Sequence, residues 1–472
     1  MSTIMLEVPA ALKEMVPALR DLLETVGAQI ERAAGLAPTT AYEDYETALR
    51  EGLRAVECSA HGLALAALDV DAPRLRIDGV EHVRVGRYAT TFMSQAGEVP
   101  IASRSLYRRA GDRNGATVDL VALRSGAVDG VWLPGTARAM AYLLQQGTSR
   151  EAEATAHELG RLPYSRSSFE RVGHSVGVAY LGVRKHVERE LIEAFEVPRD
   201  ARSISLSLDR VAVPMEEPLP RPVGRPRKRA PKNPVCRVYR MAYCGTVTLH
   251  DANGEGIHTI RYGTMPGCDP GELCTAVVDD AMALRSRRPS LQLALLNDGA
   301  PEMWNLLSDE LDDGVERIEL LDYYHVVEKL APAAKVIFGA DADKNLSRWK
   351  LALLNSDKAA RRILRELVDS GREHLSRDGE RPVHDAITYL ENNLERMKYA
   401  SARERGLPIG SGNVEATCKT LVGIRMKRCG SRWKIDTGEH VIQLRALALS
   451  DRWTAAMALT LRAPRVSIRR VA

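Results

Sequence analysis

The stretch LQLALLNDGA, residues 291–300, decides the fold class. Five of its first six residues are apolar, and a short apolar run that ends in a polar turn is typical of a strand buried on both faces. Asp298 stands in the turn directly after this run. Because strands of this kind occur in sheets that are covered by helices, the sequence predicts an α/β layer fold.

Segments on either side of this strand supply the rest of the layer. Further strands are predicted at 203–208, 238–249, 257–262 and 318–321. Helices are predicted at 270–287, over most of 326–405, and directly after the glycine-rich segment 406–413. Strands that alternate with helices, with parallel pairing between strands, predict one α/β core whose last helix follows a helical insertion.

The N-terminal half has a different pattern. Apolar residues at three- and four-residue spacing predict helices up to about residue 70, and β-like runs at 83–93 and 99–107 predict a hairpin. A capping box at Thr148 and Glu151, then Gly160 and a second helix start, outline a helix-turn-helix. A DNA-binding helix-turn-helix and an αα-hairpin that only packs both fit this pattern.

The chain of 472 residues exceeds the size of one ordinary hydrophobic core, so we expect several domains. Changes of pattern divide it into six parts. They are a helical N-terminal region (1–75), a β-hairpin region (76–135), a helix-turn-helix-like DNA-binding region (136–198), the first part of the core (199–325, with a basic linker at 216–235), the helical insertion (326–405), and the last core helix with the C-terminal tail (406–472).

The net charge does not identify a partner, because 66 Lys and Arg against 62 Asp and Glu leave only +4. Charged residues interrupt the first thirty positions, and no apolar run is long enough for a membrane helix. We therefore expect a cytoplasmic protein without a membrane partner. The seven cysteines include no CxxC pair, which argues against both disulfides and a structural zinc site.

A proline-rich basic segment is the first candidate for DNA contact. No acidic residue occurs between Glu217 and Asp251, so the charge there is entirely positive. Its Gly-Arg-Pro core resembles an AT-hook, whose arginines enter a narrow minor groove. A solvated loop stiffened by proline is the alternative. The candidate DNA-binding residues are Arg225, Arg227, Lys228 and Arg229.

Three acidic residues are the candidates for catalysis. We expect Asp209 at the end of the strand 203–208, Asp298 at the end of the strand 291–296, and Glu415 just inside the last helix. Side chains in such places can converge on one crevice of an α/β sheet. Converging carboxylates repel each other unless divalent cations neutralise them, and oxygen ligands suit Mg²⁺ or Mn²⁺. Two ions about 4 Å apart would support phosphoryl transfer on nucleic acid.

The order Asp298-Gly-Ala, Asp322-x-x-His325 and Gly410-Ser-Gly-Asn-x-Glu415 resembles a known pattern. The chain resembles the DDE transposases of bacterial insertion sequences, above all the Kra-type family and more distantly the Mutator-like group. The most specific stretches are 406–419, 425–428 and 432–433. The resemblance implies an RNase H-like core with Asp209, Asp298 and Glu415 as catalytic residues that bind two Mg²⁺ or Mn²⁺ ions.

The same resemblance gives His325 an assisting role, because Asp322-x-x-His325 matches the C/D-x-x-H motif of the Mutator-like group. A buried Asp–His hydrogen bond that supports the strand end is the alternative reading. Relatives usually carry Asp-Gly at the first acidic position, whereas here Arg210 follows Asp209 and would place a cation beside the metal site. Asp251 is therefore a second candidate for the first acid. Relatives often carry cysteines near the position of Tyr107, and their absence predicts a hairpin without metal.

A second basic cluster follows Glu415, and no acid occurs before Asp436. Cations beside a metal site can hold the phosphates of the cut strand. Trp433 either stacks on an unpaired base or packs in the core. The candidate DNA-binding residues here are Lys419, Arg425, Lys427, Arg428 and Arg432.

These features together predict a transposase that binds the terminal inverted repeats of its element and a target DNA. It would cut DNA and join the 3′-hydroxyl to the target in a Mg²⁺-dependent reaction. The resemblance also implies a homo-oligomer that acts on paired ends. A catalytically inactive DNA-binding protein derived from a transposase, and an RNase H-like nuclease that cuts without joining, are the alternatives.

Overall fold

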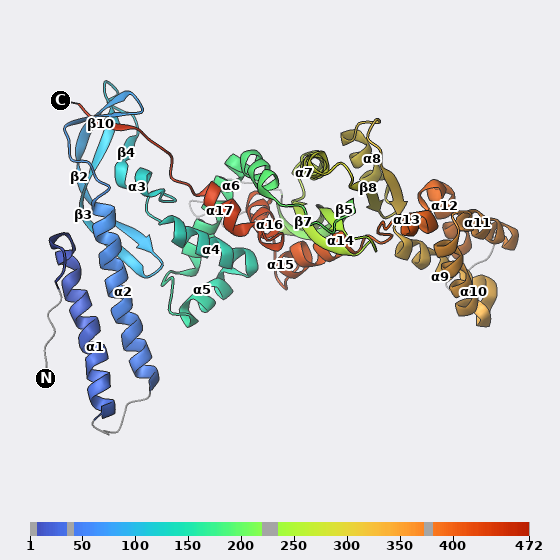
Figure 1. The fold of residues 1–472 in the computed structure, drawn as a ribbon, viewed down its shortest axis with the longest axis horizontal. Coiled ribbons are helices and arrows are strands. Elements are labelled where there is room, and N and C mark those ends of the chain that lie inside the picture. The colour runs from blue at the N-terminus through green and yellow to red at the C-terminus, as the bar shows by residue number, and fades with distance from the viewer. Residues whose placement is uncertain (1–6, 35–41, 220–234, 372–380, 472) are drawn as a thin grey trace, which may run out of the picture. The chain divides into compact units, whose positions relative to one another are not determined.

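The computed structural model describes residues 7–34, 42–219, 235–371 and 381–471 (Figure 1). The chain forms a mixed α/β structure with two five-stranded sheets, each in its own compact unit. The first unit comprises Met1–Arg184 and Met457–Ala472, and the second comprises Lys185–Ala456. Within the described residues, no helix has the length and apolar character needed to cross a membrane. The finer six-part division stays a prediction.

The sheet of the first unit has the order β10-β1-β2-β3-β4, and all its neighbouring strands are antiparallel. The predicted hairpin is confirmed, because β2 and β3 pair along their length around a turn that ends at Gly97. Gly97 has a φ of +134°, which disfavours any side chain at that position. The strands are β1 (Arg74–Ile77), β2 (Val80–Ser94), β3 (Gly97–Arg109), β4 (Thr117–Asp119) and β10 (Ile468–Arg470).

Helices of the N-terminal half agree with the predicted pattern. The capping box is present: the Thr148 hydroxyl accepts from the Glu151 N–H at 3.2 Å, and the Glu151 carboxylate accepts from the Thr148 N–H at 2.7 Å. Gly160, at φ +62°, separates the two helices of the helix-turn-helix outline. The helices are α1 (Val16–Ala34), α2 (Tyr42–Ala66), α3 (Leu120–Ser125), α4 (Pro134–Gln146), α5 (Ser149–Glu158) and α6 (Arg166–Ala194), and α17 (Trp453–Thr460) lies near the C-terminus.

The sheet of the second unit has the order β7-β6-β5-β8-β9. Strand β6 is antiparallel to both β5 and β7, whereas β5 and β8, and then β8 and β9, are parallel. The predicted buried strand is confirmed as β8, which is shifted by one residue and buried from Leu293 to Asn297. The strands are β5 (Ser203–Pro218), β6 (Val235–His250), β7 (Gly256–Thr264), β8 (Gln292–Asn297) and β9 (Ile318–Leu321).

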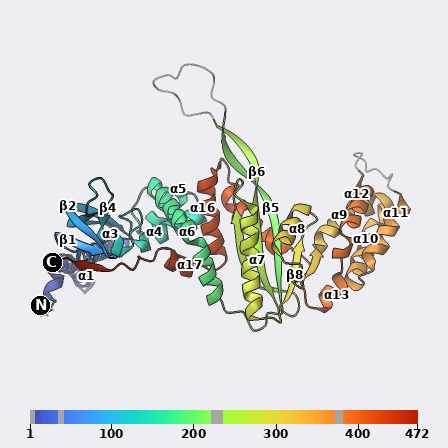
Figure 2. The same cartoon turned by 90° about the horizontal axis from the view of Figure 1, so that it is seen from above.

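The prediction that the first core strand ends at Asp209 is wrong. Strand β5 continues to Pro218 because β6 pairs with it along its whole length. Its pairing with β8, in contrast, stops at Leu206. Figure 2 shows the consequence: β5 and β6 extend as a two-stranded ribbon beyond the rest of the sheet. Asp209 thus lies within β5, three residues past its last partner on β8.

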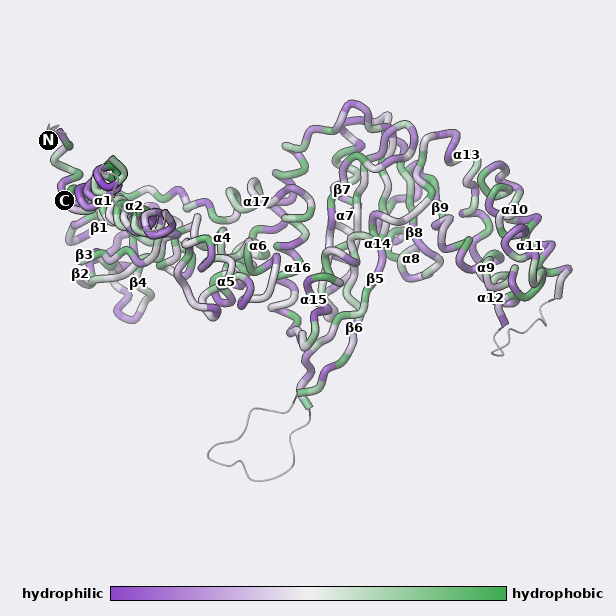
Figure 3. The backbone as a smooth tube through the Cα atoms, turned by 90° about the horizontal axis from the view of Figure 1, so that it is seen from below, coloured by the Kyte–Doolittle hydropathy of each residue, from purple (hydrophilic) through white to green (hydrophobic). Residues whose placement is uncertain are grey.

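Helices pack around this sheet and form the predicted insertion. The helices from α9 to α13 alternate hydrophilic and hydrophobic residues, as Figure 3 shows, and bury their apolar faces in one continuous core with the sheet. The helices are α7 (Pro270–Arg287), α8 (Pro301–Glu310), α9 (Tyr323–Phe338), α10 (Ala342–Asn355), α11 (Ala359–Ser370), α12 (Pro382–Asn393), α13 (Tyr399–Glu404), α14 (Gly412–Thr417), α15 (Ile424–Met426) and α16 (Ile435–Leu449). A π-helical turn at Cys418–Gly423 joins α14 to α15.

A buried histidine holds the turn between β6 and β7. His250 Nδ1 donates to the Gly254 carbonyl at 3.0 Å, so Nε2 is left to accept from the Ser205 hydroxyl at 2.8 Å. Burial lowers the pKa of His250 from 6.5 to about 4, although the contact with Gly254 opposes the change. The neutral ring therefore belongs to the folded state.

We predict that this histidine makes the second unit sensitive to acid. Because the pKa is lowered on folding, its contribution of about 3 kcal/mol is complete above pH 6.5 and is lost as the pH falls toward 4. The His250→Asn variant should be less stable at pH 7 but should lose less stability between pH 6.5 and 4, measured by urea unfolding. Equal pH slopes for the two proteins would contradict this assignment.

Candidate active site

Two of the predicted acids lie beside each other at the carboxyl end of the parallel strands. Asp298 directly follows β8, and Asp209 lies just past the last β5–β8 pair. Asn297 fixes this junction, because its side-chain oxygen accepts from the Leu208 N–H at 2.7 Å and its carbonyl accepts from the Asp322 N–H at 2.8 Å. Asn297 is completely buried. Nothing in the sequence around Asn297 indicates this contact, because its partner Leu208 lies 89 residues away along the chain.

Asp298 sits in a tight turn that the helical insertion covers. Its carboxylate accepts from the Ala300 N–H at 2.9 Å, and its carbonyl accepts from the Trp304 indole at 2.7 Å. A Cβ atom at Gly299 would collide with the ring of Tyr389 on α12. Glycine is therefore needed after Asp298 so that α12 can approach the strand end closely.

Asp209 is destabilised as an anion. Burial raises its pKa, and the nearby charge of Asp298 raises it further. Hydrogen bonds from the Arg210 N–H, at 2.6 Å, and from the Cys418 thiol oppose this change, as does His325. The pKa of Asp209 thus responds to both Asp298 and His325, which places the three side chains in one electrostatic environment.

Arg210 does not face Asp209, contrary to the expectation that it places a cation beside the site. Successive side chains of a strand point to opposite faces, and Arg210 forms an ion pair with Glu302 on α8. The Tyr243 hydroxyl binds the same carboxylate. The guanidinium is therefore held by α8, away from the carboxylate that precedes it.

Asp322 is a buried anion that connects β9 to the segment before α14. One carboxylate oxygen accepts from the N–H groups of Tyr324 and His325 at 2.6 and 3.0 Å, which caps α9. The other accepts from the backbone and hydroxyl of Ser411. Burial would raise the pKa of Asp322, but its interactions with His325 and Ser411 outweigh burial and lower it to about 2.

His325 stands between two carboxylates. Its Nδ1 lies 3.7 Å from Asp322 Oδ1 and 3.6 Å from Glu415 Oε1, too far for a hydrogen bond but close enough for strong attraction. The Asp322 side chain is the main cause that raises the pKa of His325 to about 9, and Glu415 adds to it. The ring is therefore protonated at neutral pH, and the simple buried Asp–His hydrogen bond is replaced by an ion-paired triad.

The same three residues bring side-chain atoms that could bind a metal ion close together. Among the described residues, Asp322, His325 and Glu415 form the group in which one ligand atom from each lies within 4.8 Å of the others. The predicted trio of Asp209, Asp298 and Glu415 does not gather so closely. Glu415 is joined to Asp209 indirectly, because Cys418 lies one helical turn after Glu415 and binds Asp209 through its thiol.

The segment before α14 fixes the position of Glu415. Ser411 contacts Glu415 Oε1 at 3.3 Å while it binds Asp322. Gly406 has a φ of +68°, and a Cβ there would collide with the Ala252 carbonyl in the β6–β7 turn. The β6–β7 turn therefore packs closely against the start of the glycine-rich segment. Half of the Glu415 side chain is exposed.

Asp251 is excluded as the first acid. It follows β6, and the register pairs His250 with Ser203, at the start of β5, whereas Asp209 pairs with Cys244. Asp251 is seven residues past Cys244 along the chain, which puts it about 23 Å from Asp209, at the other end of the sheet. Its carboxylate instead accepts from the N–H groups of Asn253 and Glu255 at 2.8 and 2.9 Å and closes the β6–β7 turn.

The basic residues after Glu415 fall into two groups. Arg425 is buried, and its guanidinium lies 4.9 Å from the centre of the Trp433 ring. Trp433 donates to the Met426 carbonyl at 3.0 Å and packs against the core, which supports the packing interpretation of this residue. Arg428 is half-buried, and the exposed cations are Lys419, Lys427 and Arg432. The linker residues Arg225, Arg227, Lys228 and Arg229 lie outside the described residues.

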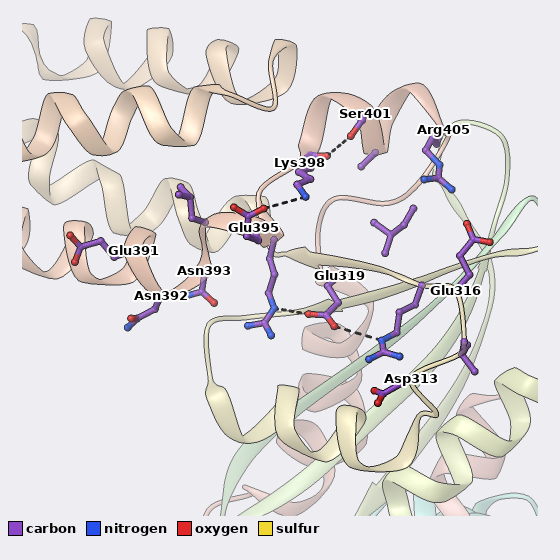
Figure 4. Close-up of a pocket in the computed structure, with 16 residues that line it drawn as sticks. Asp313, Glu316, Glu319, Glu391, Asn392, Asn393, Glu395, Lys398, Ser401 and Arg405 are labelled. Carbon is purple, nitrogen blue, oxygen red and sulfur yellow. Dashed lines mark hydrogen bonds and ion pairs between the residues drawn. The ribbon is translucent and has the colours of Figure 1, made fainter.

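An open cavity of about 940 Å³ lies elsewhere in the second unit (Figure 4). Its wall includes the start of β9, the end of the strand opposite to Asp322. Glu319 accepts from Arg396 there at 2.9 Å, and Lys398 pairs with Glu395 at 3.4 Å. Several of the charges that line this cavity are thus paired with each other, and the predicted acids are not among its lining residues.

Comparison with known proteins gives solved structures only. No family model and no curated protein matches the chain. The Drosophila P element transposase strand transfer complex shares 13% identity over 69% of this chain and 82% of that chain, with a TM-score of 0.24. The Mos1 transposase paired-end complex with left transposon end shares 14% identity over 58% and 79%, with a TM-score of 0.16. The Mos1 mariner paired end complex with Mn shares 16% over 46% and 61%, also at 0.16.

We predict that Asp322 is the main structural support of the site. The Asp322→Ala variant leaves three backbone N–H groups without this acceptor and removes one of the two acceptors of the Ser411 hydroxyl, at a cost of about 2–5 kcal/mol. Amide hydrogen exchange should become faster in residues 323–326 and 409–415. Replacement of the exposed Asp369 by Ala should leave exchange there unchanged, and wild-type exchange in the Asp322 variant would contradict the prediction.

Proposed function

We propose that this chain is a DNA transposase of the DDE type, and that Asp209, Asp298 and Glu415 are its catalytic carboxylates. The observation that carries the proposal is the placement of carboxylates from β5, β8, β9 and α14 around one end of the sheet. Asn297 holds the first two strands together there, and Ser411 links the last two elements. Three antiparallel strands beside two parallel ones, with a helical insertion before α14, support an RNase H-like core for this sheet.

The donor set fits divalent metal ions. Asp209 is an anion disfavoured by burial and by Asp298, so a cation between them would be stabilised. We propose that Asp209, Asp298 and Glu415 hold two Mg²⁺ or Mn²⁺ ions. When bound, such ions activate an attacking water or 3′-hydroxyl and stabilise the leaving oxygen of a phosphodiester.

The side chains around the acids would position DNA. Exposed Lys419, Lys427 and Arg432 follow Glu415 and would hold phosphates of the strand to be cut. Protonated His325 keeps Glu415 near Asp322 and would assist by holding this carboxylate at the site until it turns toward a bound ion. The DNA would be the terminal inverted repeats and the target, bound by a homo-oligomer, with further contacts from the basic linker and the helix-turn-helix region.

Arg210 bears on the alternative of an inactive DNA-binding protein. That alternative depended on a cation beside Asp209, and the ion pair of Arg210 with Glu302 removes its main support. A nuclease that cuts without joining would use the same residues. Analysis of the reaction products, with joined strands as the positive result, distinguishes it from a transposase.

The direct test of the proposal is the Glu415→Gln variant. It should lower Mg²⁺-dependent cleavage and joining of DNA that carries the ends of the element by more than about 100-fold, because a metal ligand is lost. The Glu404→Gln variant changes an exposed glutamate on α13 and should keep wild-type activity. Strand transfer that survives Glu415→Gln would exclude the metal-binding role.

The exposed cations after Glu415 give a second prediction. Each phosphate contact contributes about 0.9 to the slope of log K against log salt. Replacing Lys419, Lys427 and Arg432 by Ala should therefore flatten that slope by about 2 to 3 in DNA binding. A control that replaces three exposed lysines of the insertion, Lys335, Lys344 and Lys358, should leave it unchanged, and equal flattening in both variants would contradict a local contact.

A further inference from the structure

One face of the sheet in the first unit is solvent-exposed and basic. Its other face carries Leu75, Ile77 and Tyr107 and is covered in the core. Because side chains alternate along a strand, the residues between these point outward. The outward residues of the four strands β10, β1, β2 and β3 include Arg469, Arg74, Arg76, Glu81, Val83 and Arg108.

Two of these arginines stand directly opposite each other. The register of β1 and β10 pairs Arg76 with Arg469, and both side chains are exposed. Like charges directly opposite each other across a sheet destabilise it. Neither residue forms an ion pair with another described residue. A pair of this kind is an unfavourable arrangement for the free protein and a favourable one for binding an anion between the two guanidinium groups.

Neighbouring residues extend the charge across the sheet. Glu81 on β2 lies opposite Arg76 of β1, and its carboxylate forms an ion pair with Arg74 at 3.0 Å. Val83 on β2 separates Arg74 from Arg108 on β3. Arg108 Nε is buried without a hydrogen-bond partner among the described atoms. Four cations thus face one anion over adjacent strands about 4.8 Å apart, which makes an array of positive charges and not a single anion site.

We propose that this face of the β10-β1-β2-β3 surface binds the sugar-phosphate backbone of duplex DNA, with a phosphate held between Arg76 and Arg469. The guanidinium groups suit this partner, because their planar donors match phosphate oxygens two at a time. The choice of DNA rests on the proposed function, whereas the anion-binding character rests on the sheet alone. The C-terminal strand β10 thereby becomes part of a DNA-binding surface.

The test is DNA binding by the full chain over a series of salt concentrations, with labelled duplex DNA of arbitrary sequence. The Arg76→Ala/Arg469→Ala variant should flatten the slope of log K against log salt by about 2, since each phosphate contact contributes about 0.9. The Arg20→Ala/Arg32→Ala variant removes two exposed arginines of α1 and should keep the wild-type slope. A wild-type slope in the first variant would overturn the proposal.

A further variant and two further measurements distinguish direct binding of DNA from an effect on folding. Arg76→Lys/Arg469→Lys keeps both charges and should restore the slope, whereas a flattened slope there would show that the arginines act through folding and overturn the proposal. Because the two arginines repel each other, the alanine variant should melt no lower than the wild type. If the alanine variant has a flatter salt slope than the wild type for RNA of the same sequence but not for DNA, the choice of DNA as the partner is overturned. DNA binding is measured here without cleavage or joining, so this proposal and the proposed function can fail independently.

Discussion

The burial of carboxylates at one end of a sheet is the constraint on which the rest of the second unit depends. Burial, with a further contribution from the charge of Asp298, raises the pKa of Asp209, and Asp322 is an anion without solvent contact. The surrounding donors offset this cost: the N–H groups at the start of α9, Ser411, the Cys418 thiol and protonated His325. Buried anions persist only where such partners are supplied, so the insertion and α14 are fixed in place by the same charges that form the site.

Much of the fold could be predicted because its signals are local. A strand buried on both faces, a capping box and a hairpin turn each depend on a few neighbouring residues, and β8, Thr148 and the β2–β3 hairpin confirm them. The end of β5 could not be predicted, because it depends on pairing with β6 far along the chain.

Side-chain placement at the site was predictable only in part. The acids Asp209, Asp298 and Glu415 were named from their positions at element ends, and the structure puts all three around one end of the sheet. It joins Glu415 most closely to Asp322 and His325, however, and spacing along the sequence could not reveal this pairing. The contact of Asn297 could not be predicted, because its partner lies far away in the sequence, on β5. Alternation along β5 could have shown that Arg210 points away from Asp209.

The charges of the chain act as separate local groups, which explains why a net charge of +4 carries little information. Arg425 looks like its basic neighbours in the sequence but is buried against Trp433, whereas Arg76 and Arg469 face each other only because the C-terminal strand returns to β1. Contacts between residues far apart in the sequence thus decide which cations remain exposed.

The most direct test of the central claim is anomalous diffraction from crystals of the protein soaked in Mn²⁺. The account predicts an ion bound by carboxylate oxygens of both Asp209 and Asp298 at about 2.1 Å, with Glu415 turned from His325 toward the bound metal. An ion that is held only by Asp322, His325 and Glu415, or the absence of any ion at Asp209 and Asp298, would contradict it.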